Sequence, residues 1–294
     1  MDEILFDPKV KGESIYGIWH RPELKNPPQK NVAVVFLHGW AGHRSGPHDM
    51  LVKLARKLSA GGYNCFRFDF RGKGYSHGCR QQTNNHSMIE DLDAVLCYVN
   101  TVLNHPAIVL TGICSGAKLA LYYARSGNLP VTHVIELSSP ALRQQEAESE
   151  LAANRAGNTL NEYVKKIFRR ETWNKLTNGE IHFSAIRRNL SKPIYGLLSK
   201  KKKISTSGKK AVNPVQKPGE KPFGKFQGQM LLIHGEKDPE TKPALRQIQD
   251  MLHRHNIPSD TYVVKGANHS FYSLSWEYEI IKKITEWLSG NYNS

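Results

Sequence analysis

A cysteine stands where a short apolar run meets a helical pattern, between two glycines. The segment reads Gly112-Ile113-Cys114-Ser115-Gly116 and follows the apolar run 107–111. A nucleophile on so tight a turn needs small residues two positions before and two positions after it, because larger side chains would collide there. Cys114 has this register, whereas Ser115 has isoleucine and alanine at the corresponding positions. The pattern predicts a cysteine nucleophile, and the start of the following helix favours its thiolate form.

An acid and a histidine follow this cysteine along the chain. Asp238 comes shortly after a late apolar run, and His269 follows the next one. A carboxylate that accepts a hydrogen bond from a histidine fixes its tautomer, and the histidine can then exchange a proton with the nucleophile. The order of the three residues predicts a triad of Cys114, His269 and Asp238. Glu136 is an alternative acid, and Glu236 is a weaker one because its spacing from the strand is wrong.

The developing oxyanion needs hydrogen-bond donors beside the nucleophile. The backbone N–H of Ser115 is expected to be one of them. The second is expected from the turn His38-Gly39-Trp40-Ala41-Gly42, where the N–H of Trp40 is the best candidate. The alternative is a plain glycine-rich turn with no role in catalysis. The indole of Trp40 is also a candidate for lining an acyl pocket.

The elements that must position these residues alternate between strand and helix. Apolar runs predict strands at 3–6, 14–20, 32–37, 65–70, 107–111, 134–137, 230–233 and 262–264. Helical spacing predicts helices at 48–58, 88–103, 115–124, 244–255 and 275–288. Such alternation implies a mainly parallel sheet with helices on both faces. Ligand sites in such folds lie beyond the carboxyl ends of the strands, where all the candidate residues fall.

One stretch interrupts the alternation and divides the chain. The predicted core comprises residues 1–139 and 228–294, with a helical cap at 140–198 and a flexible basic loop at 199–227. The cap follows the sixth predicted strand. Phe168 and Trp173 of the cap are candidates for binding an acyl chain, although aromatic residues in a helical cap more often form its own small core.

The composition excludes several classes of protein. An apolar share of 39% and a charged share of 23% are typical of a globular protein with a large core. No apolar run approaches the ~18 residues that a membrane span needs. The first residues carry acids where a signal peptide would carry bases, so a cytoplasmic location is expected.

The net charge of +15 is concentrated in one segment. Residues 187–227 hold 12 Lys or Arg and one Glu, a net of +11, which leaves +4 for the rest. No recognition motif or aromatic interleaving accompanies this charge, so nucleic-acid binding is not expected. The basic loop is either a solvated linker or a surface that attracts an anionic substrate, an acyl carrier protein or a membrane.

The spacing of the four cysteines predicts neither a disulfide framework nor a zinc site. Cys65 lies in an apolar strand pattern and Cys97 in an apolar helix pattern, so both are expected in the core. Cys79 lies in a predicted loop. Neither a metal nor another cofactor is expected.

Several motifs together resemble the α/β-hydrolase superfamily. They are HGWAG at 38–42, DFRGKGYS at 69–76, GICSG at 112–116, HGEKD at 234–238 and GANH at 266–269. The resemblance implies an α/β-hydrolase fold and gives the turn 69–76 a structural role. The usual nucleophile of the superfamily is serine, so Cys114 is a departure that dienelactone hydrolases and polyhydroxyalkanoate synthases share. The segment 163–179 is similar to hydrolases encoded beside bacterial exosortase systems.

A cysteine nucleophile favours substrates with good leaving groups, because the sulfur itself returns when the leaving group is poor. The expected function is hydrolysis of an ester or thioester through an S-acyl intermediate on Cys114. Coenzyme A and an acyl carrier protein are candidate carriers of the acyl group. Because a thioester also reacts with amines, thiols and alcohols, acyl transfer is a second hypothesis. A binding protein with a degenerate nucleophile is the third.

Overall fold

The computed structural model describes residues 2–23, 30–140, 223 and 226–292. All of them belong to one compact unit of the chain. The predicted cap at 140–198 and basic loop at 199–227 lie outside the described residues, apart from Pro140, Phe223, Phe226 and Gln227. Phe223 and Phe226 are buried in the core. The hydrophobic core therefore includes residues that precede position 228.

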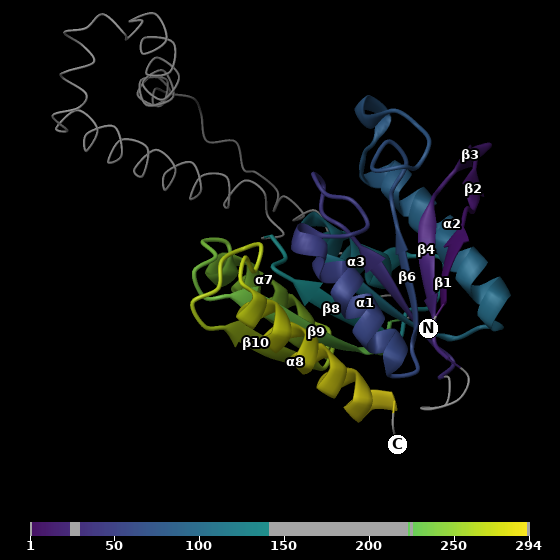
Figure 1. Cartoon of the computed structure of the whole chain (residues 1–294). Helices are drawn as coiled ribbons and strands as arrows, with labels where there is room; N and C mark the ends of the chain where they lie inside the picture. The colour runs from purple at the N-terminus through teal and green to yellow at the C-terminus, as the bar shows by residue number, and fades with distance from the viewer. Residues whose placement is uncertain (1, 24–29, 141–222, 224–225, 293–294) are drawn as a thin grey trace, which may run out of the picture. The chain divides into compact units, whose positions relative to one another are not determined.

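The core is built on one large sheet of the order β1-β4-β6-β5-β7-β8-β9-β10 (Figure 1). Its strands are β1 (Asp2–Phe6), β4 (Gly17–Arg21), β5 (Val32–Leu37), β6 (Asn64–Phe68), β7 (Ala107–Ile113), β8 (His133–Leu137), β9 (Gln229–Gly235) and β10 (Ser259–Val264). The pairs β1–β4 and β4–β6 are antiparallel, and all the others are parallel. The fully apolar β5 is buried along its whole length, as expected for a strand covered on both faces.

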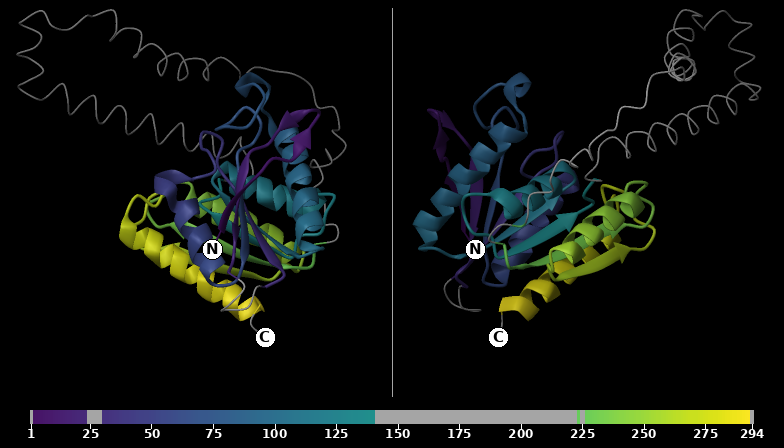
Figure 2. Two further views of the ribbon diagram at one scale, coloured as in Figure 1. Left: turned by 45° about the vertical axis from the view of Figure 1, so that its right-hand side comes forward. Right: turned by 180° about the vertical axis from the view of Figure 1, so that it is seen from behind.

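Helices cover both faces of this sheet. Side chains of α1 (Met50–Ala60) and α8 (Leu274–Tyr292) share one apolar core with one face. Those of α2 (Asn85–Leu103), α3 (Ser115–Ser126) and α7 (Thr241–Arg254) share a second core with the opposite face. Figure 1 shows the side with α1 and α8, and the right panel of Figure 2 shows the other. The alternation in the sequence correctly predicts this three-layer fold.

The N-terminal region differs in detail from the prediction. The strand expected at 14–20 is divided into β3 (Glu13–Ser14), which pairs with β2 (Lys9–Val10), and β4. Short 3-10 helices lie at Pro47–Asp49 and Arg80–Gln82. Within the large sheet, β8 is the sixth strand along the chain, so residues 140–198, for which the cap is predicted, come after the expected strand in the sequence.

The prediction that Cys97 lies in the core is wrong. Cys97 is exposed, whereas Cys65 is buried as expected. The buried face of α2 is formed by Met88, Leu92, Val95, Leu96 and Val99. Cys97 is two positions away from both Val95 and Val99, which turns it by about 200° from each of them on a helix, so its side chain lies on the opposite side.

Candidate active site

Cys114 lies on a strained turn at the carboxyl end of β7, near the centre of the sheet. Its backbone has φ 56° and ψ −124°, an unusual conformation for a residue with a side chain. The N–H of Cys114 donates to the carbonyl oxygen of Leu137 at 2.9 Å, which ties the turn to β8. Cys114 is partly exposed, unlike the fully buried Cys65.

The two glycines of the turn allow the main chain to pack closely around it. A Cβ on Gly112 would lie 2.3 Å from the carbonyl oxygen of Gly116. A Cβ on Gly116 would lie 2.2 Å from the carbonyl oxygen of Leu37. Both obstacles are backbone atoms, which no change of rotamer can move. The spacing predicted for a nucleophile turn therefore has its steric cause in this structure.

His269 and Asp238 meet at the same edge of the sheet. The ring Nδ1 of His269 lies 2.8 Å from Oδ2 of Asp238, whose side chain is almost fully buried. Burial raises the pKa of Asp238, but the hydrogen bonds from His269 and from the N–H of Glu240 outweigh it and lower the pKa below its usual value. Asp238 is therefore a charged acceptor that orients the ring.

His269 also lies within hydrogen-bond contact of Cys114. The bond to Asp238 first, and that to Cys114 second, raise the pKa of His269 to about 10 although burial opposes them. The ring thus holds its proton at neutral pH. A protonated imidazole beside sulfur stabilises a thiolate, which is the nucleophilic form of cysteine.

A second histidine near His269 and Asp238 is held neutral. His234, at the end of β9, is completely buried, and burial lowers its pKa to about 4 despite the opposing charge of Asp238. Neither of its ring nitrogens has a hydrogen-bond partner within the described part of the chain. His234 therefore adds no positive charge that would compete with His269.

The two alternative acids do not pair with His269. Glu136 lies in β8, fully buried, and neither of its carboxyl oxygens has a partner among the described residues. Burial alone raises its pKa to about 8, so it is mostly protonated at neutral pH. Glu236 accepts a hydrogen bond from the N–H of Gly266 at 2.7 Å and thereby links the loops that carry Asp238 and His269.

Trp40 and Ser115 lie together beside the nucleophile, with a contact that the sequence did not indicate. The N–H of Trp40 donates to the side-chain Oγ of Ser115 at 2.5 Å. This is the donor predicted for the oxyanion, and in this structure it is bound to a hydroxyl. A Cβ placed on Gly39 would lie 3.4 Å from Cβ of Cys114, so the turn also passes close to the nucleophile.

Buried polar contacts fix the turn that carries Trp40. The N–H of Phe70 donates to Nε2 of His38 at 3.4 Å, so Nδ1 carries the proton and donates to the carbonyl oxygen of Gly39 at 2.8 Å. Burial lowers the pKa of His38 and keeps it neutral. His38 therefore links the loop after β5 to the turn after β6.

Asp69 and Ser76 hold together the turn 69–76, for which the resemblance implies a structural role. The buried carboxylate of Asp69 accepts from the N–H of Arg44 at 2.7 Å, from its guanidinium, and from the N–H of Tyr75 at 3.1 Å. A Cβ on Gly74 would overlap this carboxylate at 2.2 Å. Ser76 donates to the carbonyl oxygen of Asp69 at 2.5 Å. These bonds close the turn on itself without contacting the triad.

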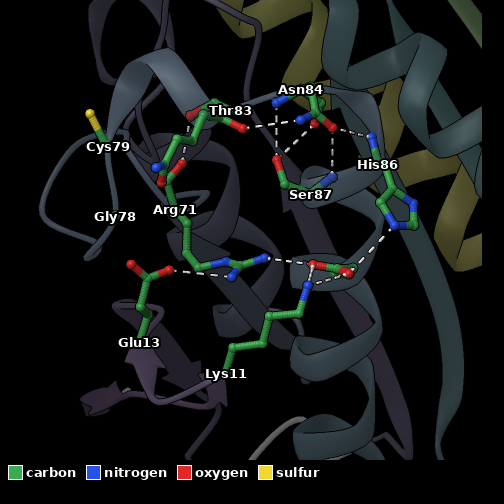
Figure 3. Close-up of a pocket in the computed structure, with 11 residues that line it drawn as sticks. Lys11, Glu13, Arg71, Gly78, Cys79, Thr83, Asn84, His86 and Ser87 are labelled. Carbon is green, nitrogen blue, oxygen red and sulfur yellow. Dashed lines mark hydrogen bonds and ion pairs between the residues drawn. The ribbon is translucent and has the colours of Figure 1, made fainter.

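A pocket of about 410 Å³ lies on another part of the surface, beside the β2–β3 hairpin and the start of α2 (Figure 3). Its charged groups are already paired with one another. Arg71 contacts Glu13, Glu90 and Asp91, and Lys11 contacts Glu90 at 2.9 Å. Because the cations are neutralised within the pocket wall, this pocket offers no unmatched charge to a ligand.

The remaining predictions concern substrate-binding residues, metal ions and the membrane. Phe168 and Trp173 lie outside the described residues. No cluster of three or more His, Cys, Asp or Glu side chains that would suit a metal ion occurs in the described ranges. Within those ranges, no helix combines the length and apolar character needed to cross a membrane.

Two side chains near the site escaped the sequence analysis. One is the hydroxyl of Ser115, which was considered only as an out-of-register nucleophile and not as an acceptor for Trp40. The other is Lys73, whose ammonium lies 4.5 Å from the ring centroid of Trp40. No local pattern marks either contact, since each joins loops that follow different strands.

Comparisons with known proteins extend these observations. The family model described as serine aminopeptidase, S33, matches residues 28–272. A proline iminopeptidase from Mycobacterium smegmatis has a similar structure, with a TM-score of 0.61, 16% identity, and 98% of each chain covered. An esterase from Pyrococcus furiosus gives a TM-score of 0.59 at 17% identity, over 98% of this chain and 91% of that chain.

Two further relatives show how far the similarity reaches. A dienelactone hydrolase from Anabaena variabilis gives a TM-score of 0.58 at 13% identity, over 99% of this chain and 98% of that chain. The human protein ABHD12B is 36% identical over 74 residues, which are 24% of this chain and 19% of the human protein. The curated relative is thus matched over only about a fifth of its length. The family model, by contrast, spans most of the chain, and the chain belongs to the serine aminopeptidase S33 family of hydrolases with the α/β-hydrolase fold.

Proposed function

We propose that this hydrolase cleaves an ester or thioester through a covalent intermediate on Cys114, within a triad completed by His269 and Asp238. The observation that carries the proposal is a partly exposed cysteine with φ 56° on the turn after β7, in contact with a histidine that is itself 2.8 Å from a buried carboxylate. The family takes its name from serine, so the cysteine is the feature that sets this chain apart.

In the first half of the reaction, the thiolate of Cys114 attacks the carbonyl carbon of the substrate. A carbon–sulfur bond forms, and the π electrons of the carbonyl move to its oxygen. When the tetrahedral intermediate collapses, the bond to the leaving alcohol or thiol breaks, and the leaving atom takes the proton of His269. The products of this half are an S-acyl cysteine and the free alcohol or thiol.

In the second half, His269 is neutral and acts as the base. It accepts a proton from water, whose oxygen attacks the thioester carbon, and collapse returns the thiolate of Cys114 and releases a carboxylic acid. Asp238 holds the ring in one orientation throughout. The N–H groups of Ser115 and Trp40 bind the oxyanion, and for this the substrate oxygen replaces the hydroxyl of Ser115 on the Trp40 amide.

The chemistry of sulfur favours esters and thioesters over amides, although the family name refers to peptide cleavage. A thiolate leaves a tetrahedral carbon more readily than an amine does, so attack on an amide mostly reverses. An alkoxide or thiolate leaving group competes better with Sγ. The S-acyl intermediate is also open to amines, thiols and alcohols, which makes acyl transfer a measurable alternative fate of the same intermediate.

The decisive experiment is intact-protein mass spectrometry after incubation with a panel of acyl thioesters, combined with turnover of an activated ester. We expect an acyl mass on the wild-type protein, and none on the Cys114→Ala variant, whose turnover falls to the background. Ser115→Ala is the matched control and retains most of the activity, because its hydroxyl only occupies the Trp40 amide in the free enzyme. An acyl group found on Ser115, or full activity in Cys114→Ala, would overturn the proposal.

The same samples decide between hydrolysis and transfer. If an added amine, thiol or alcohol accelerates loss of the acyl mass and appears acylated, the intermediate is transferred. If only the free acid forms at an unchanged rate, the intermediate is hydrolysed.

A further inference from the structure

Lys73 is a buried cation to which the described part of the chain offers no hydrogen-bond acceptor. The residue is only 7% exposed, and its Nζ has no hydrogen-bond partner among the described residues. The described neighbouring cations differ in this respect, since Arg44 pairs with Asp69 and Arg71 with Asp91. A buried ammonium that lacks an acceptor is unfavourable, because desolvation is not compensated by a hydrogen bond.

Lys73 reaches the active site through Trp40. Its Nζ lies 4.5 Å from the centre of the Trp40 ring. The backbone N–H of the same tryptophan donates a hydrogen bond to Oγ of Ser115, the residue after the proposed nucleophile. The two loops meet because β5 and β6 are parallel neighbours, so that the turns after them lie at one edge of the sheet. A single residue thus connects the ammonium to the position of the reacting carbonyl.

The ammonium of Lys73 also has no counter-ion among the described residues. Burial first, and the positive charge of Arg80 second, lower the pKa of Lys73. No carboxylate in the described ranges forms an ion pair with either Lys73 or Arg80. Trp40, whose ring covers this ammonium, is itself 42% exposed, so a ligand can approach the ring from solvent.

We propose that Lys73 binds an anionic group of the substrate, in the part of the substrate that lies along Trp40, and so makes the enzyme selective for negatively charged acyl esters or thioesters. The proposal rests on the proposed function for the identity of the reacting group. The anion is a carboxylate at the far end of the acyl chain or a phosphate of the leaving group. Either one supplies the acceptor that the ammonium lacks, in a charge-assisted hydrogen bond shielded from water.

Three thioesters of one chain length distinguish the two sources. S-Pentanoyl-N-acetylcysteamine is neutral, S-glutaryl-N-acetylcysteamine carries a carboxylate on the acyl group, and pentanoyl-coenzyme A carries phosphates on the leaving group. We expect the wild-type kcat/KM for one of the two anionic substrates to exceed that for the neutral one by about ten- to a hundredfold, the effect of one charge-assisted bond.

The Lys73→Met variant keeps the apolar stem of the side chain and removes the charge. In this variant, kcat/KM for the anionic substrate should fall to that for the neutral substrate, which itself should not change. Lys73→Arg should keep part of the higher kcat/KM for the anionic substrate. Lys57→Met, which removes an exposed lysine on α1, is the control for a general effect of charge and should leave all three rates unchanged. An equal loss on all three substrates in Lys73→Met would assign Lys73 only to supporting Trp40 and would overturn the proposal.

A binding measurement separates this proposal from the proposed function. Glutarate and coenzyme A are titrated by calorimetry into Cys114→Ala and into the double variant Cys114→Ala/Lys73→Met, where no turnover is needed. We expect one of the two ligands to bind the double variant at least tenfold more weakly. Equal binding to both variants would overturn the role of Lys73, while unchanged turnover in Cys114→Ala alone would overturn only the identity of the nucleophile.

Discussion

At the scale of single residues, the site depends on the charge that Asp238 places beside His269. The carboxylate is buried and accepts from the ring at 2.8 Å, while the ring itself is about one-third exposed. A buried negative charge stabilises a proton on the ring, so the imidazole beside Cys114 is positively charged. The pair also stabilises the fold below pH 6.5, and this stabilisation is lost as the pH rises through about 10, because the folded state binds the proton more tightly.

Replacing the acid by its neutral amide tests this coupling. In Asp238→Asn, the pKa of His269 should fall from about 10 toward 6.5, because the largest interaction that raises it is removed. An NMR titration of the ring protons measures this shift, and the rate of Cys114 alkylation by iodoacetamide at pH 7 should fall with it. Asp250→Asn, at an exposed position on α7, is the control and should change neither quantity. An unchanged titration of His269 in Asp238→Asn would mean that another group holds its proton.

At the scale of elements, the turn between β7 and α3 is fixed by backbone packing more than by side-chain contacts. Gly116 lies at the start of α3 and passes against the end of β5, where the carbonyl oxygens of Leu37 and His38 leave no space for a methyl group. This contact brings the loop of Trp40 to the nucleophile. The same backbone contact thus positions the start of α3 against β5 and places the Trp40 loop beside Cys114.

A pair of glycine-to-alanine substitutions separates this packing from helix propensity. In Gly116→Ala, the added methyl carbon would lie 2.2 Å from the Leu37 oxygen, so we expect a loss of about 3 kcal/mol or more in unfolding free energy. In Gly290→Ala, on α8, nothing lies within 4 Å of the new carbon, so stability should rise by about 0.5–1 kcal/mol. Denaturant unfolding measures both. Equal effects of the two substitutions would contradict a steric role for Gly116.

At the scale of the whole molecule, the core contains an acid whose charge the fold does not accommodate. Glu136 is buried in the middle of the sheet, between β7 and β9, without a partner among the described residues. Its pKa is about 8 in the folded protein and 4.5 for an exposed glutamate. Between these values the folded state binds the extra proton, so the free energy of unfolding falls as the pH rises.

The amide variant Glu136→Gln removes this dependence. At pH 9 we expect it to be more stable than the wild type by up to roughly 5 kcal/mol, and at pH 4 by little, because the wild-type carboxyl is then protonated in both states. Denaturant unfolding between pH 4 and pH 9 follows the difference. Glu286→Gln, at a largely exposed position on α8, should show no such trend. A stability difference between Glu136→Gln and the wild type that does not grow with pH would show that Glu136 gains a partner in solution.

The sequence alone determined the local features of this protein. The glycines around Cys114, the apolar strands and the order of Cys114, Asp238 and His269 are set by the sterics of one turn and by the periodicity of one element, so they can be found within a few neighbouring residues. These features correctly predict the three-layer fold and bring the candidate triad to one edge of the sheet. The excess charge in residues 187–227 is equally a property of the sequence.

Only the tertiary structure decided which side chains of separate loops meet. It pairs His269 with Asp238 and leaves Glu136 buried without a partner among the described residues. It turns Cys97 away from the core and places the Ser115 hydroxyl on the Trp40 amide. It also lays Lys73 against the indole of Trp40. These contacts depend on the order of the strands in the sheet and on the angles at which the loops leave them. Because residues distant in the chain set both, no local pattern in the sequence records them.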